Sequence, residues 1–156
     1  IIDIANLRTA YKQVVRNKGK GGVDGMEVKE LLTWCQSHIE DLRQSLMDGT
    51  FVPNPVRRVE IPKDNGKKRL LGIPTVIDRM VQQAISQVLS RIYEPKFSRT
   101  SYGFRPKRGA HDALREARKT VTEGYKYAVG IDLERFFDTV NQSKLIEVLS
   151  LSLIQI

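Results

Sequence analysis

The chain has 156 residues, and its 26 Lys and Arg residues against 18 Asp and Glu residues give a formal net charge of +8 at pH 7. This length suits one domain, or one domain and part of a second. With 40% hydrophobic residues, wholesale disorder is excluded. One cysteine excludes an intramolecular disulfide and a multi-cysteine zinc cage. It also fits a reducing compartment, so we expect a cytoplasmic protein. No apolar run approaches the roughly 18 residues of a membrane span, so we expect no membrane partner.

The positive charge is concentrated in two short segments. Residues 57–69 contain six basic and two acidic residues, and residues 91–108 contain six basic residues and one acidic residue. Excess positive charge attracts polyanions such as nucleic acid or an anionic membrane surface. A basic, solvated surface is the alternative, but concentration on two stretches is typical of proteins that bind a phosphate backbone.

The first third of the chain predicts two helices. Apolar residues recur at helical spacing over residues 3–17 and again over residues 27–48. The glycine-rich run 17–22 separates the two helices, because glycine is unfavourable within a helix. Cys35 lies on the apolar face of the second helix, so we interpret it as a core thiol rather than a nucleophile.

A β-hairpin is predicted next. Residues 56–62 and 68–74 resemble strands, and Asn65-Gly66 between them is a strong hairpin signal because both residues tolerate positive φ. Alternation places Val59 and Ile61 on one face. This hairpin contains most of the first basic segment.

The middle of the chain predicts two further helices around a loop. The first covers residues 76–92, with Thr75 as its N-cap. A polar, basic loop over residues 98–108 follows, and the second helix covers residues 110–123 with its apolar stripe facing inward.

The last part predicts a buried strand and a final helix. Residues 126–133 are mostly apolar and include Asp132, and Asn141 is placed to cap a helix over residues 142–150. A carboxylate at the end of a buried strand is typical of hard-cation sites, which need oxygen ligands. A helix cap after the strand is the alternative for Asp132.

Five blocks of the chain, in order, resemble the N-terminal part of group II intron-type (retron/maturase-like) reverse transcriptases. They are Gly21-Gly22-Val23-Asp24-Gly25, Ile61-Pro62-Lys63 with Arg69-Leu70-Leu71-Gly72-Ile73-Pro74-Thr75, Asp78-Arg79-Met80-Val81-Gln82-Gln83-Ala84, Ser101-Tyr102-Gly103-Phe104-Arg105-Pro106 with Gly109-Ala110-His111, and Ile131-Asp132-Leu133-Glu134-Arg135-Phe136-Phe137-Asp138. The resemblance implies an α+β fold. Residues 1–125 would form the fingers, with helices and an antiparallel hairpin, and residues 126–156 would begin the palm.

The same resemblance assigns catalytic and nucleotide-binding roles. Asp132 would be the catalytic carboxylate and would hold Mg²⁺, or Mn²⁺ in its place, together with the backbone carbonyl of Leu133. Lys63 and Arg69 flank the hairpin turn and would contact the triphosphate of a dNTP; the alternative is a solvated hairpin tip. Phe137 matches the aromatic position that packs against the nucleotide sugar, with core packing as the alternative.

The resemblance also assigns contacts with the nucleic acid. Polar residues of helix 76–92 and aromatic or basic residues of loop 98–108 would contact template or primer: Arg79, Gln83, Tyr102, Phe104, Arg105, Lys107 and Arg108. Aromatic rings suit stacking on bases, and cations suit phosphates. The alternative for the two helix residues is simple exposure to water.

One departure from the family concerns its second palm motif, an aromatic–Ala–Asp–Asp hairpin. No Asp-Asp pair occurs in the 156 residues, and two-metal catalysis needs more carboxylates than Asp132 provides. We therefore expect a fragment of an RNA-directed DNA polymerase that binds template and dNTP, has no metal bound when isolated, and is inactive alone. The alternatives are an RNA-binding maturase-type module that assists intron splicing, and a basic helical module unrelated to polymerases.

The expected partners are RNA template, primer or DNA, dNTP and intron RNA. An unpaired palm strand would also invite pairing with another chain, so we expect self-association as a homodimer. A mobile intron, a retron and a domesticated enzyme remain open as the origin. Whether Ile156 is a natural end or a cloning choice also remains open.

Overall fold

The computed structural model of the protein describes residues 1–62, 66 and 68–154. The chain divides into two compact units, Ile1–Ser101 and Tyr102–Ile156, called here the N-terminal unit and the C-terminal unit. The division into fingers over residues 1–125 and palm over residues 126–156 is a functional one and stays a prediction.

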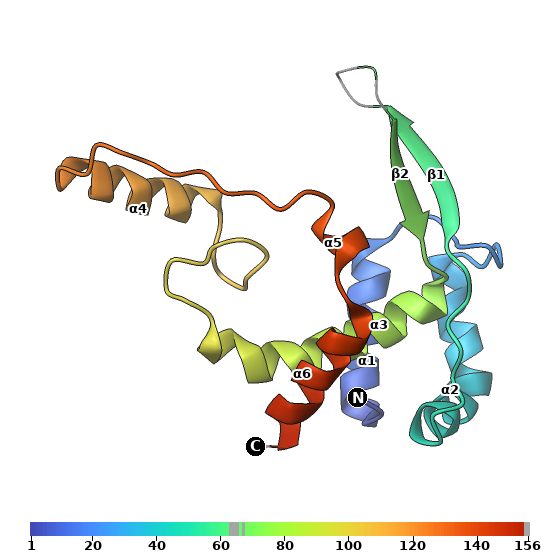
Figure 1. The fold of residues 1–156 in the computed structure, drawn as a ribbon. Coiled ribbons are helices and arrows are strands. Elements are labelled where there is room, and N and C mark those ends of the chain that lie inside the picture. Colours follow the sequence, from blue (N-terminus) through green and yellow to red (C-terminus); the bar gives the residue numbers. More distant parts are fainter. Residues whose placement is uncertain (63–65, 67, 155–156) are drawn as a thin grey trace. The chain divides into compact units, whose positions relative to one another are not determined.

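The N-terminal unit contains three of the predicted helices (Figure 1). They are α1 (Ile4–Asn17), α2 (Leu31–Met47), preceded by the 3₁₀ turn η1 (Val28–Glu30), and α3 (Val76–Tyr93), followed by the 3₁₀ turn η2 (Glu94–Lys96). The predicted ranges are confirmed to within a few residues. The exception is the start of the second helix, where the chain forms a 3₁₀ turn.

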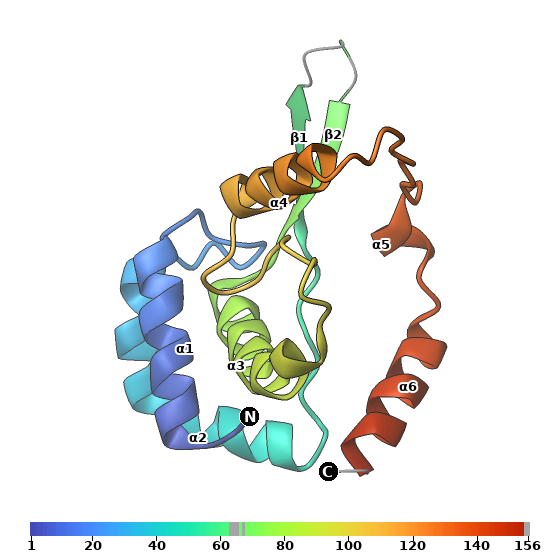
Figure 2. The same cartoon turned by 90° about the vertical axis from the view of Figure 1, so that its left-hand side faces the viewer.

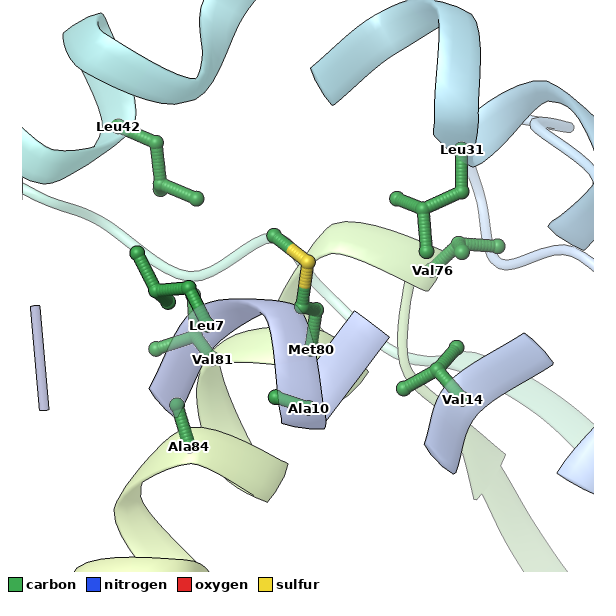
Figure 3. Close-up of a cluster of buried hydrophobic side chains, with 9 residues drawn as sticks. All are labelled: Leu7, Ala10, Val14, Leu31, Leu42, Val76, Met80, Val81 and Ala84. Atoms are coloured by element: carbon green, nitrogen blue, oxygen red, sulfur yellow. The ribbon is translucent and has the colours of Figure 1, made fainter. Parts of the chain in front are cut away.

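Three helices share one hydrophobic core. Figure 3 shows side chains from α1, α2 and α3 gathered around Met80. The buried set is Leu7, Ala10, Val14, Leu31, Leu42, Val76, Met80, Val81 and Ala84. Fully burying one large aliphatic side chain contributes about 1.5–3 kcal/mol, so this cluster is the main source of stability of the N-terminal unit.

Polar side chains reinforce the contact between α1 and α3. The Asn6 amide nitrogen donates to the Ala84 carbonyl at 3.1 Å, and Gln87 Nε2 donates to Asn6 Oδ1 at 2.7 Å. Cys35 is half-buried at the edge of the core, with its Sγ 3.9 Å from Met80 Sδ. Burial raises the pKa of the Cys35 thiol, which fits the predicted packing role.

The predicted hairpin is confirmed as two antiparallel strands, β1 (Arg57–Pro62) and β2 (Lys68–Ile73). Val59 lies opposite Leu71 and Ile61 opposite Arg69, so these four side chains share one face. Figures 1 and 2 both show the hairpin extending away from the helices of its unit. The pattern of alternating residues therefore correctly placed Val59 and Ile61 on one face of the hairpin.

The C-terminal unit contains α4 (Ala110–Thr122), α5 (Phe136–Thr139) and α6 (Gln142–Ile154). The predicted cap of the last helix is confirmed, because Asn141 Oδ1 accepts the backbone N–H of Lys144 at 2.9 Å. The inward-facing stripe predicted for α4 is wrong. No residue of α4 is buried, and Leu114 and Val121 are 65% and 68% exposed.

The prediction of a buried strand over residues 126–133 is also wrong. This segment has no strand structure, and Tyr127, Val129 and Ile131 are 96%, 87% and 86% exposed. A strand requires hydrogen bonds to a neighbouring strand. Within the described residues, β1 and β2 pair only with each other, so the segment has no strand to join.

No helix in the described ranges is both long enough and apolar enough to cross a membrane.

Candidate functional site

The hairpin presents a cation on its more apolar face. Arg69 lies on β2 opposite Ile61 and is exposed. On the other face, Lys68 Nζ forms an ion pair with Glu60 Oε2 at 2.5 Å. Among the described residues no carboxylate pairs with Arg69, so it is open to an anionic ligand there, whereas Lys68 is already paired. Lys63, the other predicted triphosphate contact, lies outside the described residues.

The two polar candidates on α3 make contacts within the N-terminal unit. The Arg79 guanidinium donates to the carbonyl oxygens of Lys18 and Lys20, at 3.2 and 3.0 Å. Gln83 Nε2 donates to Gln87 Oε1 at 3.3 Å. Arg79 thus holds the glycine-rich loop over residues 18–25, and the nucleic-acid contacts of both residues stay predictions.

A cleft of about 460 Å³ lies beside this loop. Its lining residues are Gly19, Lys20, Gly21, Gly25, Glu27, Val28, Lys29 and Arg57. Three of its side chains are cationic and one is anionic, and that anion, Glu27, pairs with Lys29 at 2.7 Å. The cleft next to the base of the hairpin is therefore electropositive, a property that suits phosphate groups.

Residues 102–108 of the basic loop belong to the C-terminal unit, and Tyr102 there is half-buried. The Arg108 guanidinium carbon lies 5.5 Å from the centre of the Tyr102 ring, within the range of a cation–π contact. Phe104 is fully exposed. Phe104 and Lys107 adopt φ of 55° and 59°, a left-handed conformation that is uncommon for such residues. Lys107 is exposed and Arg105 is half-buried.

The predicted catalytic segment is open to solvent. Asp132 and Leu133 are exposed, and Phe137 is 89% exposed, with its ring 5.4 Å from that of Phe136 in an edge-on arrangement. Asp138, six residues after Asp132, pairs with Arg135 at 3.3 Å.

The donors needed for a metal ion are not gathered in this segment. Across the described ranges, no group of three or more His, Cys, Asp or Glu side chains lies close enough to hold a metal. One carboxylate and one carbonyl are too few for a two-metal centre. The described residues therefore do not by themselves provide enough ligands for the two metal ions that the family resemblance implies.

Sequence reasoning missed the importance of the first turn of α3. Thr75 caps the helix as predicted, since its Oγ1 accepts the Asp78 N–H at 3.1 Å. Asp78 itself is only 3% exposed, although it has no place in the predicted site. The signal is present in the sequence as an acid three residues after a threonine, a spacing close to that of a capping box.

Comparison with known sequences identifies the class of protein. Residues 61–154 match the profile of the family described as reverse transcriptase (RNA-dependent DNA polymerase). The match includes the end of β1, all of α3, the basic loop and Asp132, with β2 between them, and it covers more than half of the chain, so the chain belongs to the reverse transcriptase family. Members of this family generally use a divalent metal ion and have nucleic-acid partners.

The relatives among curated proteins include intron proteins and an Escherichia coli protein. The group II intron-encoded protein LtrA of Lactococcus lactis subsp. cremoris is 38% identical over 145 residues, which is 92% of this chain and 24% of LtrA. Protein YkfC of E. coli (strain K12) is 39% identical over 147 residues, 90% of this chain and 39% of YkfC. Nuclear intron maturase 2, mitochondrial, of Arabidopsis thaliana is 43% identical over 61 residues, 39% of this chain and 8% of that protein. The chain thus spans well under half of each relative, and the predicted resemblance is confirmed.

Proposed function

We propose that this chain is the fingers region, residues 1–125, and the beginning of the palm, residues 126–156, of an RNA-directed DNA polymerase. In this proposal it binds template, primer and dNTP. The supporting observation is an exposed cation, Arg69, on the hairpin strand β2, which falls inside the region matching the reverse transcriptase family. A projecting hairpin can bring such a cation to the triphosphate and offset the charge that develops during phosphoryl transfer.

The nucleotide contacts in this proposal are Lys63, Arg69 and Phe137. The two cations would bind the triphosphate, and the exposed ring of Phe137 would lie against the sugar. Hydrogen exchange of residues 68–73 with and without dNTP tests this directly. We expect dNTP to slow exchange on β2, and Arg69→Gln to abolish that effect. Arg58→Gln, on the opposite face of the same hairpin, is the matched control and should retain it.

The nucleic-acid contacts in this proposal come mainly from the basic loop: Tyr102, Phe104, Arg105, Lys107 and Arg108, with Arg79 and Gln83 on α3. Each phosphate contact with a single strand contributes about 0.7 to the slope of log K against log salt concentration. Replacing Arg105, Lys107 and Arg108 by Gln should therefore reduce the RNA-binding slope by about 2. An equal charge loss on α4, with Arg115, Arg118 and Lys119 changed to Gln, should leave the slope unchanged. An equal fall in both variants would contradict the assignment to the loop.

For the metal, we propose that the Asp132 carboxylate and the Leu133 carbonyl contribute ligands to Mg²⁺, with Mn²⁺ as a substitute. When bound, the ion would activate the primer hydroxyl and stabilise the leaving pyrophosphate. Because the described residues provide too few donors, we expect no primer extension by this chain alone. An extension assay with purified chain, labelled primer, template and either ion tests this. Clear extension would contradict it.

A maturase-type module that binds intron RNA is the second candidate. It is favoured by the intron proteins among the relatives, one of which is named an intron maturase. RNA binding fits both candidates, whereas dNTP-dependent protection of β2 fits only the polymerase. Protection by RNA without any response to dNTP would favour the maturase-type module.

We also propose self-association as a homodimer through the segment over residues 126–133, at the start of the incomplete palm. Its apolar side chains are exposed, and an unpaired extended segment can pair with a second copy. Light scattering over a range of concentrations should show a rising mass, and a constant monomer mass would contradict the proposal.

We also propose a cytoplasmic location for the protein, and fractionation of the source cells tests it.

A further inference from the structure

Asp78 is a buried carboxylate in the first turn of α3. Its Oδ2 accepts the hydroxyl of Thr75 at 2.6 Å and the backbone N–H of Asn54 at 3.2 Å. Its Oδ1 is buried and has no hydrogen-bond partner among the described atoms. All the hydrogen bonds accepted by this carboxylate therefore pass through one oxygen, and that oxygen joins two different segments of the chain.

Those two segments flank the hairpin and are called here its legs: residues 54–56 lead into β1, and residues 74–75 follow β2. Asn54 lies three residues before Arg57, where β1 begins, and Thr75 lies two residues after Ile73, where β2 ends. The legs also lie against each other, since a Cβ added to Gly72 would approach Val56 Cγ2 to 2.8 Å. Asp78 Oδ2 thus links the incoming leg and the outgoing leg at the point where both reach α3.

The surroundings explain how a charge is tolerated at this position. Burying a carboxylate is unfavourable unless donors replace its lost water. The Asn54 N–H and the Thr75 hydroxyl are such donors, and the first turn of a helix also favours negative charge. Asp78 is therefore well placed to accept bonds from both legs, whereas an alanine could accept neither.

The hairpin amplifies any movement at its base. Arg69 pairs with Ile61, four residues along β1 from Arg57, which places it about 13 Å from the start of the strand at roughly 3.3 Å per residue. A small rotation of the base would move Arg69 by a larger distance. The position of the proposed triphosphate contact thus depends on how firmly the base is held.

We propose that Asp78 is a positioning residue. Its hydrogen bonds to Asn54 and Thr75, called here the clasp, hold both legs of the hairpin and so fix the position of Arg69 relative to the nucleotide. It acts through Asn54 and Thr75 and touches no substrate. The consequence for nucleotide binding rests on the proposed function of the hairpin. The clasp itself can be measured without nucleotide.

The first test measures amide hydrogen exchange by NMR in the full chain. Asp78→Ala should accelerate exchange of the Asn54 amide by about tenfold to a hundredfold, because a hydrogen bond to a charged group is lost. Asp78→Asn, which keeps an acceptor oxygen, should restore much of the protection. Asp41→Ala removes an exposed acid of α2 in the same unit and should change nothing.

Core amides of α1 and α3 show whether a variant is folded. If they remain protected while the Asn54 amide is unaffected by Asp78→Ala, the clasp is overturned. If Asp78→Ala fails to fold, Asp78→Asn with its own exchange measurement still decides the question. In Asp78→Asn, which keeps an acceptor oxygen, retained protection of the Asn54 amide would support the clasp. Complete loss of that protection would overturn it.

A distance measurement tests the positioning itself. Spin labels at Arg58→Cys on β1 and Ser37→Cys on α2, with Cys35→Ala to remove the native thiol, report the distance between hairpin and helices. Asp78→Ala should broaden the distance distribution, and Asp41→Ala should not. An equally narrow distribution in Asp78→Ala would contradict the proposal.

A comparison with Arg69→Gln separates this proposal from the function on which it builds. Arg69→Gln should abolish dNTP-dependent protection of β2 without changing the spin-label distances. Asp78→Ala should change both measurements. If dNTP has no effect on the parent protein, the proposed function of the hairpin fails, and the Asn54 exchange and the distances still decide whether Asp78 clasps the hairpin.

Discussion

Both units of this protein contain helices with an apolar stripe, but the stripe is buried in only one of the units. In the N-terminal unit, apolar side chains of α2 and α3 such as Leu31 and Met80 are completely buried. In the C-terminal unit, Leu114 and Val121 form a similar stripe on α4 but are 65% and 68% exposed. Helical periodicity therefore shows which face of a helix could be buried, and a second element must be present to bury it.

Hydrogen bonds differ between the units in a similar way. In the N-terminal unit, Arg43 Nε donates to the Ile2 carbonyl at 2.9 Å and Arg79 donates to the Lys20 carbonyl at 3.0 Å, across long stretches of sequence. Along α4 and α6, bonds such as that from Thr120 Oγ1 to the Glu116 carbonyl join residues within one turn. Local bonds stabilise a helix but do not pack it against another element.

The largest expected effect is the loss of core packing. Met80→Ala should lower the free energy of unfolding of the N-terminal unit by about 2–5 kcal/mol, because it leaves a cavity among three helices. Leu114→Ala, on the exposed face of α4, should change stability by less than about 0.5 kcal/mol. Denaturation followed by the fluorescence of Trp34, which packs against the core, measures the first variant, and circular dichroism measures both. Equal effects would break the contrast between the units.

Glycine substitutions should show the same contrast. A Cβ added to Gly22 would lie 2.6 and 2.7 Å from backbone atoms of Thr75, whereas one added to Gly103 would meet nothing within 4 Å. Gly22→Ala should cost about 1–3 kcal/mol, as expected for overpacking. Gly103→Ala should cost far less. A thermal melt of each variant checks this, and a neutral Gly22→Ala would show that the loop can move away from α3.

Helix capping should have a smaller effect that again depends on the unit. Thr75 and Asn141 cap α3 and α6 by accepting backbone N–H groups at 3.1 and 2.9 Å. Removing a cap typically costs about 0.5–2 kcal/mol. Thr75→Ala should lower the stability of the whole N-terminal unit, whereas Asn141→Ala should only increase fraying at the start of α6. Circular dichroism and amide exchange at the first turn of each helix measure the two outcomes.

The smallest effect concerns pH. Burial raises the pKa of the Cys35 thiol, so the folded state holds this proton more tightly than the unfolded state. This contribution is complete below the ordinary thiol pKa of about 8.5 and is lost as pH rises through the higher folded value. The stability of the N-terminal unit should therefore fall slightly more steeply above about pH 8.5 than that of Cys35→Ala. Parallel denaturation curves at pH 7 and pH 10 test the difference.

The local structure was predictable where short-range chemistry decides it. Helical spacing predicted α1 and α3, Asn65-Gly66 with the flanking alternation predicted the hairpin, and Thr75 and Asn141 predicted two caps. The family membership was also predictable from blocks in the right order. The segment over residues 126–133 was not, because its apolar composition describes a strand only if another strand lies beside it.

For the candidate site too, some features follow from the local sequence and others depend on which segments the fold brings together. The types and order of Arg69, Tyr102 and Asp132 are properties of the sequence, and they are sufficient to propose a chemistry. The sequence by itself determined the long helices, the hairpin with Val59 and Ile61 on one face, and the membership in the reverse transcriptase family, because these follow from short patterns of neighbouring residues. Only the tertiary structure decided that Arg79 holds the glycine-rich loop and that Asp78 joins both legs of the hairpin. Those contacts form between segments that the fold brings together and that no local pattern relates.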